Sequence, residues 1–382
     1  MSVQSVQSVQ ALISTQSTQS TQSTQGAGGG GHANPLMSAA LTASHDGVVG
    51  TEVLDPEAIA RRRDAIIAIE ADRVTAAEDP EVLPRFPDDV FALQAIVGGL
   101  LQSVRMVAGP TVARIHPRLA ADDPGLYDTY AETPLIEMIR PDVDQFAQQL
   151  AFVRSYADLR DERMPEILVQ LDDILSFFGA IDLVDTPRTP NTVLLLTAAL
   201  GFSGALTQRV KLAFDGPRPS AFSPRLQPVI ATPSHGTLPS GHATEAHLIA
   251  GILSLLRGGS PSRSAGDMDH RFRLAARIAV NRTVAGVHYP VDSGAGAVLG
   301  LALAEHLGAV AGQGAPGNWR FDGAAWDNRD FHHGVVADLV AASGAEGATP
   351  VSRTAGAQGR AVDDLWARLW RNAEAELIQD EG

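Results

Sequence analysis

The stretch LPSGHAT at residues 238–244 is a loop that leads into the apolar run AHLIAGIL at 246–253, which predicts a buried helix. The first N–H groups of a helix have no partner within it, and the helix dipole adds positive charge there, so such a start can hold an oxyanion. Ser240 adds a hydroxyl, Gly241 admits an anion close to the backbone, and His242 can carry protons near neutral pH. Alone, the stretch also fits an N-cap serine followed by a buried histidine.

Two flanking segments supply cations and a His–Asp pair. The segment KLAFDGPRP lies upstream at 211–219, and RTVAGVHYPVD lies downstream at 282–292. Arginine offers paired planar donors to an oxyanion, and lysine offers a point charge. Gly286 is expected to end one helix and Pro290 to begin the next, which brings His288 and Asp292 onto one face. Asp292 can then accept the N–H of one ring nitrogen and aim the other into the pocket.

The three segments, in this order, resemble the signature of the type 2 phosphatidic acid phosphatase and vanadium haloperoxidase superfamily: K-x6-RP, PSGH and SR-x5-H-x3-D. The resemblance spans about residues 200–305. One position departs from the signature, because Asn281 stands where serine is usual. An amide can still form local hydrogen bonds there.

The resemblance implies a role for each residue of the three segments. One ring nitrogen of His288 is either the nucleophile on phosphorus or the only protein ligand of vanadate. His242 is the general acid or base, and Asp292 orients His288. The oxyanion, vanadate or phosphate, would be held by Lys211, Arg218, Ser240, Gly241 and Arg282.

Phosphate and vanadate share shape and charge, so one pocket could serve two reactions. A phosphatase forms a phosphohistidine, whereas a haloperoxidase keeps vanadate bound and oxidises a halide with hydrogen peroxide, without haem or flavin. His235 stands seven residues before His242, where many haloperoxidases carry an aromatic residue or histidine; a solvated loop histidine is its other interpretation. We expect a vanadate-dependent haloperoxidase acting on bromide or iodide. The alternative is a soluble acid phosphatase acting on a phosphate monoester, and a weaker alternative is a non-catalytic anion-binding or assembly protein.

Composition limits the partners and the compartment. The 382 residues carry a formal net charge of −15, no cysteine and only 5% aromatic residues, which argues against nucleic acid as a partner and excludes thiolate metal sites. Residues 2–10 repeat Ser-Val-Gln and residues 14–25 repeat Ser-Thr-Gln, and a glycine-rich stretch follows to residue 31. Residues 1–45 are therefore expected to form a disordered tail. The tail lacks the features of a signal peptide, and we expect a soluble protein, cytoplasmic rather than secreted.

Helical periodicity dominates the rest of the chain. It recurs over 55–69, 89–107, 143–158 and 158–180, while alternating strand patterns are scarce. We therefore expect a mainly α catalytic domain at 46–340, a helical bundle of the vanadium haloperoxidase or acid phosphatase type. Residues 189–208 carry no charge over the length of a membrane span, but their Pro, Asn, Gly and Thr favour a buried core helix. No integral membrane association is expected.

The C-terminal region divides into three parts. Residues 317–326 are expected to form a loop with aromatic anchors, and 341–382 a linker followed by an amphipathic helix from about 361 to 378. That helix carries Trp366 and Trp370 on one apolar stripe. The stripe could dock on the chain's own core or pack on a second subunit, so a homo-oligomer through this helix is a further expectation.

Overall fold

The computed structural model describes residues 89–120, 129–182, 184–261, 269–314, 316–342, 349–356 and 362–378. These ranges lie in one compact unit, and a second unit, Ser20–Pro87, falls outside them. The predicted tail at 1–45 and the predicted helix at 55–69 therefore lie outside the described residues. The domain boundaries at residues 45 and 340 stay predictions.

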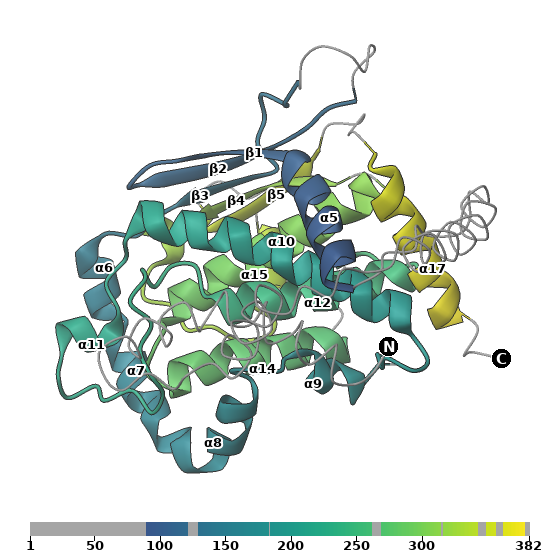
Figure 1. Cartoon of the computed structure of the whole chain (residues 1–382). Helices are drawn as coiled ribbons and strands as arrows, with labels where there is room; N and C mark the ends of the chain where they lie inside the picture. The colour runs from purple at the N-terminus through teal and green to yellow at the C-terminus, as the bar shows by residue number, and fades with distance from the viewer. Residues whose placement is uncertain are drawn as a thin grey trace, which may run out of the picture. The chain divides into compact units, whose positions relative to one another are not determined.

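Four long helices form the centre of this unit (Figure 1). They are α10 (Pro190–Phe214), α12 (Gly241–Leu256), α14 (His270–Val284) and α15 (Pro290–Val310). Helix α12 packs against the other three, and every residue of α15 is buried. Two peripheral helices, α5 (Asp89–Gln102) and α17 (Asp364–Ile378), pack on α10.

Glycines let α15 lie directly against the first turns of α12. A Cβ atom at Gly296 would lie 2.6 Å from the backbone oxygen of Ser240, and one at Gly300 would lie 2.5 Å from that of Thr244. No side chain larger than hydrogen fits such distances. The close approach lets the backbone N–H of Ser240 donate to the backbone oxygen of Asp292 at 3.0 Å. The beginnings of α12 and α15 are thus held side by side.

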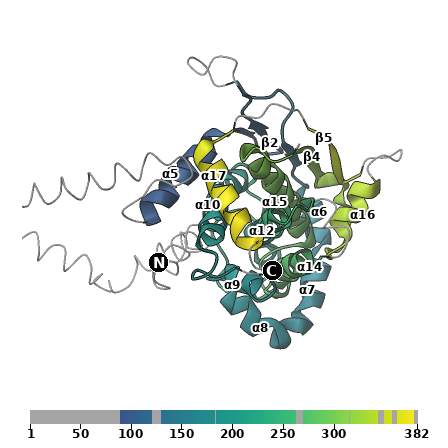
Figure 2. The ribbon, with the colours of Figure 1, turned by 90° about the vertical axis from the view of Figure 1, so that its right-hand side faces the viewer.

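A five-stranded mixed sheet accompanies the helices, so the prediction of a mainly α helical bundle is wrong. Its order is β1 (Val104–Ala108), β2 (Val112–Pro117), β3 (Ile136–Ile139), β4 (Gly317–Asp322) and β5 (Val351–Ala355). Neighbouring strands are antiparallel except β3 and β4, which run parallel with Ile136 opposite Trp319. The sheet lies on the opposite side of the central helices from α8 (Arg160–Val169), as Figures 1 and 2 both show.

The sheet escaped prediction because its strands are short and because β3 and β4, which join its two parts, lie far apart in the sequence. Charged residues interrupt them, and the Nε atom of Arg114 on β2 lies 2.6 Å from a carboxylate oxygen of Glu137 on β3. Residues 317–326, predicted as a loop, contain β4 and the short helix η3 (Ala324–Trp326). Likewise, the helix predicted at 89–107 ends at Gln102 and a strand follows.

The remaining helices are short. The helix predicted at 143–158 is broken into α6 (Val143–Gln148), α7 (Leu150–Ser155) and the 3-10 turn η2 (Tyr156–Leu159). The one predicted at 158–180 is α8 followed by α9 (Leu175–Gly179). Helices α11 (Pro219–Phe222) and α16 (Val335–Ala342) complete the described set. Helices α7, α8 and α9 all pack on α14, so they cover one side of it.

The tryptophan stripe of α17 packs on the chain's own core. Trp366 and Trp370 are both buried, and the indole N–H of Trp366 donates to the backbone oxygen of Leu307 at 2.9 Å. A homo-oligomer through this helix stays a prediction. The segments Pro190–Phe222 and Pro290–Val310 are long and apolar enough to cross a membrane by length and composition, but most of the first and all of the second is covered by protein.

Candidate functional site

Segments that are distant in the sequence converge at the beginnings of α12 and α15. Lys211 lies in the last turn of α10, Arg282 in the last turn of α14, and Arg218 immediately before α11. The buried side chains of this cluster are Lys211, Arg218, Ser240, His242, Arg282, His288 and Asp292.

The loops that meet here have tight local requirements. Asp215 ends α10 in the left-handed conformation, with φ of 42°, and its N–H donates to the backbone oxygen of Lys211. A Cβ atom at Gly236 would lie 2.8 Å from that same oxygen and 3.0 Å from the nitrogen of Gly216. Only glycine allows the 235–240 loop to lie this close to the end of α10. Lys211 therefore reaches the loop that precedes α12.

His288 and Asp292 form a buried pair at the start of α15. The Nδ1 atom of His288 lies 2.9 Å from Oδ2 of Asp292, which also accepts from the hydroxyl of Thr237 at 2.5 Å and the N–H of Tyr289 at 3.0 Å. The Nε2 atom of His288 lies 3.1 Å from Nη1 of Arg218. Because a guanidinium only donates, Nε2 is an acceptor and the ring proton is on Nδ1. The reactive lone pair of His288 therefore faces a cation.

Arg218 connects the two loops around this pair. Its guanidinium donates to the backbone oxygens of Val287 at 2.8 Å, His235 at 3.2 Å and Gly236 at 3.3 Å. Its Nη2 atom also lies 3.2 Å from Nδ1 of His235. His235 is only half-buried, so it lies at the edge of the cluster rather than within it. The structure thus brings His235 into contact with the predicted site.

The ammonium of Lys211 is held by backbone oxygens. Its Nζ atom donates to Gly236 at 3.2 Å and to Thr237 at 3.1 Å. Neutral carbonyl groups offset a buried positive charge only in part. Burial, and then the neighbouring charge of Arg218, hold the pKa of Lys211 well below its usual value. This cation would be stabilised by an anion.

His242 and Arg282 meet at a residue that the sequence did not point to, Gln170. The Nε2 atom of His242 lies 3.0 Å from the backbone oxygen of Gln170. A carbonyl only accepts, so Nε2 carries the proton and Nδ1 of His242 is the basic atom. The side-chain oxygen of Gln170 accepts from Nη2 of Arg282 at 2.9 Å. The Nε and Nη1 atoms of Arg282 are buried and have no hydrogen-bond partner in the described part of the chain.

The pKa shifts of the basic groups share one direction. Burial lowers the pKa of Arg218 to about 10 and that of Arg282 to about 9. Burial also holds the pKa of His242 and of His288 well below the usual value, with Arg282 the next cause for His242 and Arg218 for His288. These environments disfavour further positive charge and would favour a negatively charged group.

Two carboxylates moderate this positive charge. Burial raises the pKa of Asp292 to about 6, and the bonds from Thr237 and Tyr289 oppose that rise. Asp292 is therefore ionised at pH 7. Glu245, one turn after Gly241, is half-buried, and its charge raises the pKa of both Lys211 and Arg282. An ideal Cβ atom at Gly241 would lie 3.9 Å from Oε1 of Glu245.

Ser240, at the start of α12, is an N-cap residue and also lies within the cluster of cations. The hydroxyl of Ser240 accepts from the N–H of Ala243 at 3.4 Å, as an N-cap residue does. The same residue is fully buried among the cations. Apart from its own helix backbone, no atom of the described residues lies closer to the ideal Cβ position of Gly241 than Glu245 does, so this side of Gly241 is not packed against another segment.

Asn281 connects the end of α14 to α8 and to Gln170. Its Nδ2 atom donates to Glu166 and to the side-chain oxygen of Gln170, both at 3.1 Å. The expected local hydrogen bonding of this amide thus joins α14 to α8. Sequence reasoning missed Thr237, Gln170 and Glu245. Only Thr237 and Glu245 had a signal, because both lie within a few residues of the PSGH stretch.

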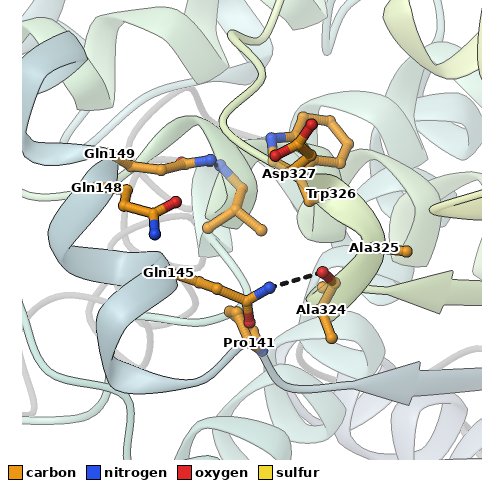
Figure 3. A pocket seen from close by; sticks show the side chains of 10 residues that line it. Pro141, Gln145, Gln148, Gln149, Ala324, Ala325, Trp326 and Asp327 are labelled. Carbon is orange, nitrogen blue, oxygen red and sulfur yellow. Dashed lines mark hydrogen bonds between the residues drawn. The ribbon is translucent and has the colours of Figure 1, made fainter.

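A separate cavity of about 270 Å³ lies beside the first turn of α15. Figure 3 shows glutamines of α6 facing Trp326 across it, with the side-chain nitrogen of Gln145 donating to the backbone oxygen of Ala324 at 2.6 Å. Gln149, next to them, accepts from the backbone N–H of Val291 at 2.9 Å. None of the predicted site residues lines this cavity. In the described ranges, no three His, Cys, Asp or Glu side chains are grouped as metal-cation ligands.

Part of the chain matches a known protein family. Residues 192–309 match the sequence model of the PAP2 superfamily, whose members are generally phosphatases or haloperoxidases. No curated protein matches the chain. The expected resemblance to this superfamily is confirmed over that range, which contains every predicted site residue. The haloperoxidase-like branch stays a prediction.

Proposed function

We propose that the protein is a vanadate-dependent haloperoxidase that oxidises bromide or iodide with hydrogen peroxide. The environment of His288 supports oxyanion chemistry at this site, and the contact of His235 with Arg218 carries the choice of a haloperoxidase. Its Nε2 lone pair faces Arg218, its Nδ1 proton is held by Asp292, and both contacts are buried. This arrangement keeps the ring neutral and fixes its orientation, with the Nε2 lone pair on the side of the cations. A histidine that binds vanadate must have both properties.

The donor set fits a tetrahedral oxyanion of high charge. Three buried cations, Lys211, Arg218 and Arg282, surround the histidines, and two nitrogens of Arg282 have no acceptor in the described part of the chain. Arginine matches oxyanion geometry through paired donors. These side chains, with Ser240 and the N–H of Gly241, would hold vanadate against His288. Bound vanadate would supply a Lewis acid that activates hydrogen peroxide without a change of its own oxidation state.

The chain's own residues would handle the protons. The basic Nδ1 atom of His242 could accept a proton from incoming hydrogen peroxide, while the backbone of Gln170 fixes the ring through Nε2. His235, at the edge of the cluster and in contact with Arg218, would be a second proton carrier near the halide. The contact between His235 and Arg218 is the observation that favours a haloperoxidase over a phosphatase.

The second candidate is phosphate monoester hydrolysis, and the orientation of His288 favours it equally. The Nε2 atom of His288 would attack phosphorus and form a phosphohistidine, and His242, protonated once the dianionic substrate is bound, would give its proton to the leaving alcohol. Water, deprotonated by His242, would then release phosphate and free His288. The same pocket serves both reactions because phosphate and vanadate share shape and charge.

The test compares the two activities in one preparation. Protein freed of bound anions would be assayed with and without orthovanadate, by bromination of an organic dye in hydrogen peroxide and by hydrolysis of an aryl phosphate. The proposal expects dye bromination that depends on orthovanadate. Brisk phosphate ester hydrolysis without any bromination would instead identify a phosphatase.

A further inference from the structure

Gln170 lies at the point where α8 meets the two halves of the cation cluster. It follows the last turn of α8, and its N–H donates to the backbone oxygen of Glu166 at 2.9 Å, so its position is fixed by the helix. Gln170 is 1% exposed. Its side-chain oxygen accepts from Arg282 at 2.9 Å and from Asn281 at 3.1 Å.

These two contacts identify the atoms of the carboxamide. Arg282 and the Nδ2 group of Asn281 can only donate, so the Gln170 atom that faces both is the oxygen. The other atom is therefore the amide nitrogen, Nε2. It is buried and has no hydrogen-bond partner in the described part of the chain.

The neighbouring guanidinium of Arg282 also has donors without acceptors in the described ranges. Nε and Nη1 of Arg282 are also buried without an acceptor among the described residues. Gln170 and Arg282 are joined by a hydrogen bond, so the three donors belong to one small region, and the same Gln170 holds His242 through its backbone oxygen. Buried donors are normally paired, because an unpaired one costs the full loss of its hydration. Adjacent donors that all lack acceptors indicate a place for an anionic acceptor.

We propose that the side-chain amide of Gln170 is a further oxyanion ligand, which donates from Nε2 while its oxygen orients Arg282. This inference rests on the proposed oxyanion chemistry and names a ligand outside residues 192–309, the range that matches the PAP2 superfamily. Helix α8 thus completes the site from a separate part of the chain. Vanadate and phosphate present the same acceptor oxygens to this amide.

The experiment measures the binding of inorganic phosphate by calorimetry, with the full chain as wild type, Gln170→Met and Gln170→Glu. Gln170→Met removes the donor and the acceptor. Gln170→Glu keeps an acceptor for Arg282 and Asn281 but places a negatively charged oxygen where Nε2 was. A hydrogen bond to a charged group predicts roughly 10- to 100-fold weaker phosphate binding by Gln170→Met. Gln170→Glu is expected to lose at least as much.

The comparison of the two variants separates a ligand from a support. If Gln170 only held Arg282 in place, Gln170→Glu would keep that contact and lose only the affinity that one added negative charge costs. Tighter phosphate binding by Gln170→Glu than by Gln170→Met would then overturn the proposal. Gln170→Glu keeps the contacts that fix α8 to α14, so it provides the test if Gln170→Met does not fold. Thermal melting verifies folding of each variant.

Gln145 provides matched controls for the loss of an amide and for the added charge. It hydrogen-bonds to Ala324 across the cavity of Figure 3, away from the cations. Gln145→Met and Gln145→Glu are expected to bind phosphate within about twofold of the wild type, the scatter of such measurements. Loss of affinity equal to that of the Gln170 variants would overturn the proposal. A wild type that binds no phosphate would overturn the proposed function as well. If the wild type binds phosphate tightly and the Gln170 variants bind it equally well, this inference alone is overturned.

Discussion

The Nε2 atom of His288 lies 3.1 Å from Nη1 of Arg218, although both groups are basic. The contact is possible because the histidine is neutral, with its single ring proton held by Asp292 on the opposite side. A neutral histidine next to a guanidinium keeps its lone pair available for phosphorus or vanadium. Burial and the charge of Arg218 both lower the pKa of His288, which keeps the ring neutral.

The first prediction separates the two chemistries through His235. Halide oxidation would use a second proton carrier at the edge of the cluster, whereas phosphoester hydrolysis needs only His242 and His288. We expect His235→Ala to lower bromide or iodide oxidation at least about tenfold, the effect of one assisting proton-transfer group. Aryl phosphate hydrolysis by the vanadate-free variant should change much less. Equal losses in both assays would mean that His235 only supports Arg218.

The second prediction concerns Glu245, whose charge opposes anion binding. Glu245→Gln removes a negative charge close to Lys211 and Arg282, so inorganic phosphate should bind roughly tenfold more tightly. Calorimetry at low salt measures the change. Glu374→Gln on α17 is a control of equal charge, because this helix contacts the start of α10 through Glu376, far along the helix from Lys211. Unchanged or weaker binding by Glu245→Gln would contradict the charge balance described for the site.

The sequence predicted the local parts of this site well. Gly286, with φ of 83°, ends the α14 segment as expected, and Pro290 begins α15. Both features depend on the conformational limits of single residues, glycine and proline, so they can be predicted from residue type alone. The convergence of Lys211, Arg218 and the PSGH stretch followed from the resemblance rather than from any local pattern.

The parts that could not be predicted depend on distant contacts. Strands β3 and β4 pair although nearly half the length of the chain separates them, and their alternation is too short to distinguish from loop. Gln170 lies more than 70 residues before His242, directly after a helix whose periodicity reports only its apolar face, so nothing in the sequence connects the two. Ion pairs such as Arg114–Glu137 also make strand residues look like loop residues.

The third prediction tests the close packing of α12 and α15. Gly296→Ala would place a methyl group 2.6 Å from the backbone oxygen of Ser240, so the helices must separate. We expect a loss of about 1–3 kcal/mol in the free energy of unfolding, measured with urea. Gly204→Ala on α10 is the matched control, because no atom of the described residues outside its own helix backbone lies within 4 Å of its ideal Cβ position. That control should be neutral or stabilising by up to about 1 kcal/mol, and destabilisation equal to that of Gly296→Ala would contradict the account.

The fourth prediction concerns stability in acid. Burial lowers the pKa of His247 to about 4, and its Nδ1 atom lies 2.8 Å from the backbone oxygen of Ala243. The unfolded chain takes up a proton near the ordinary value of 6.5, before the folded protein does. This residue's contribution is therefore complete above that pH and is lost as the pH falls from about 6.5 to 4.

The measurement is the free energy of unfolding at pH 7 and at pH 5. His247 alone accounts for about 2 kcal/mol of the decrease between them. In His247→Gln the decrease should be smaller by that amount, whatever the stability of the variant at pH 7. An identical decrease in the two proteins would show that His247 takes up its proton equally in both states. Asp292, with its raised pKa, acts oppositely between about 3.8 and 6 and is common to both proteins.

The most direct test of the central claim is the vanadate-dependent oxidation of bromide by the wild type and by His288→Ala, each measured with and without orthovanadate. The account predicts activity only in the wild type with orthovanadate. His288→Ala should retain its helical circular dichroism but lose vanadate and all turnover, because Nε2 is the proposed ligand atom. Full activity of His288→Ala would contradict the mechanism in both its haloperoxidase and its phosphatase form.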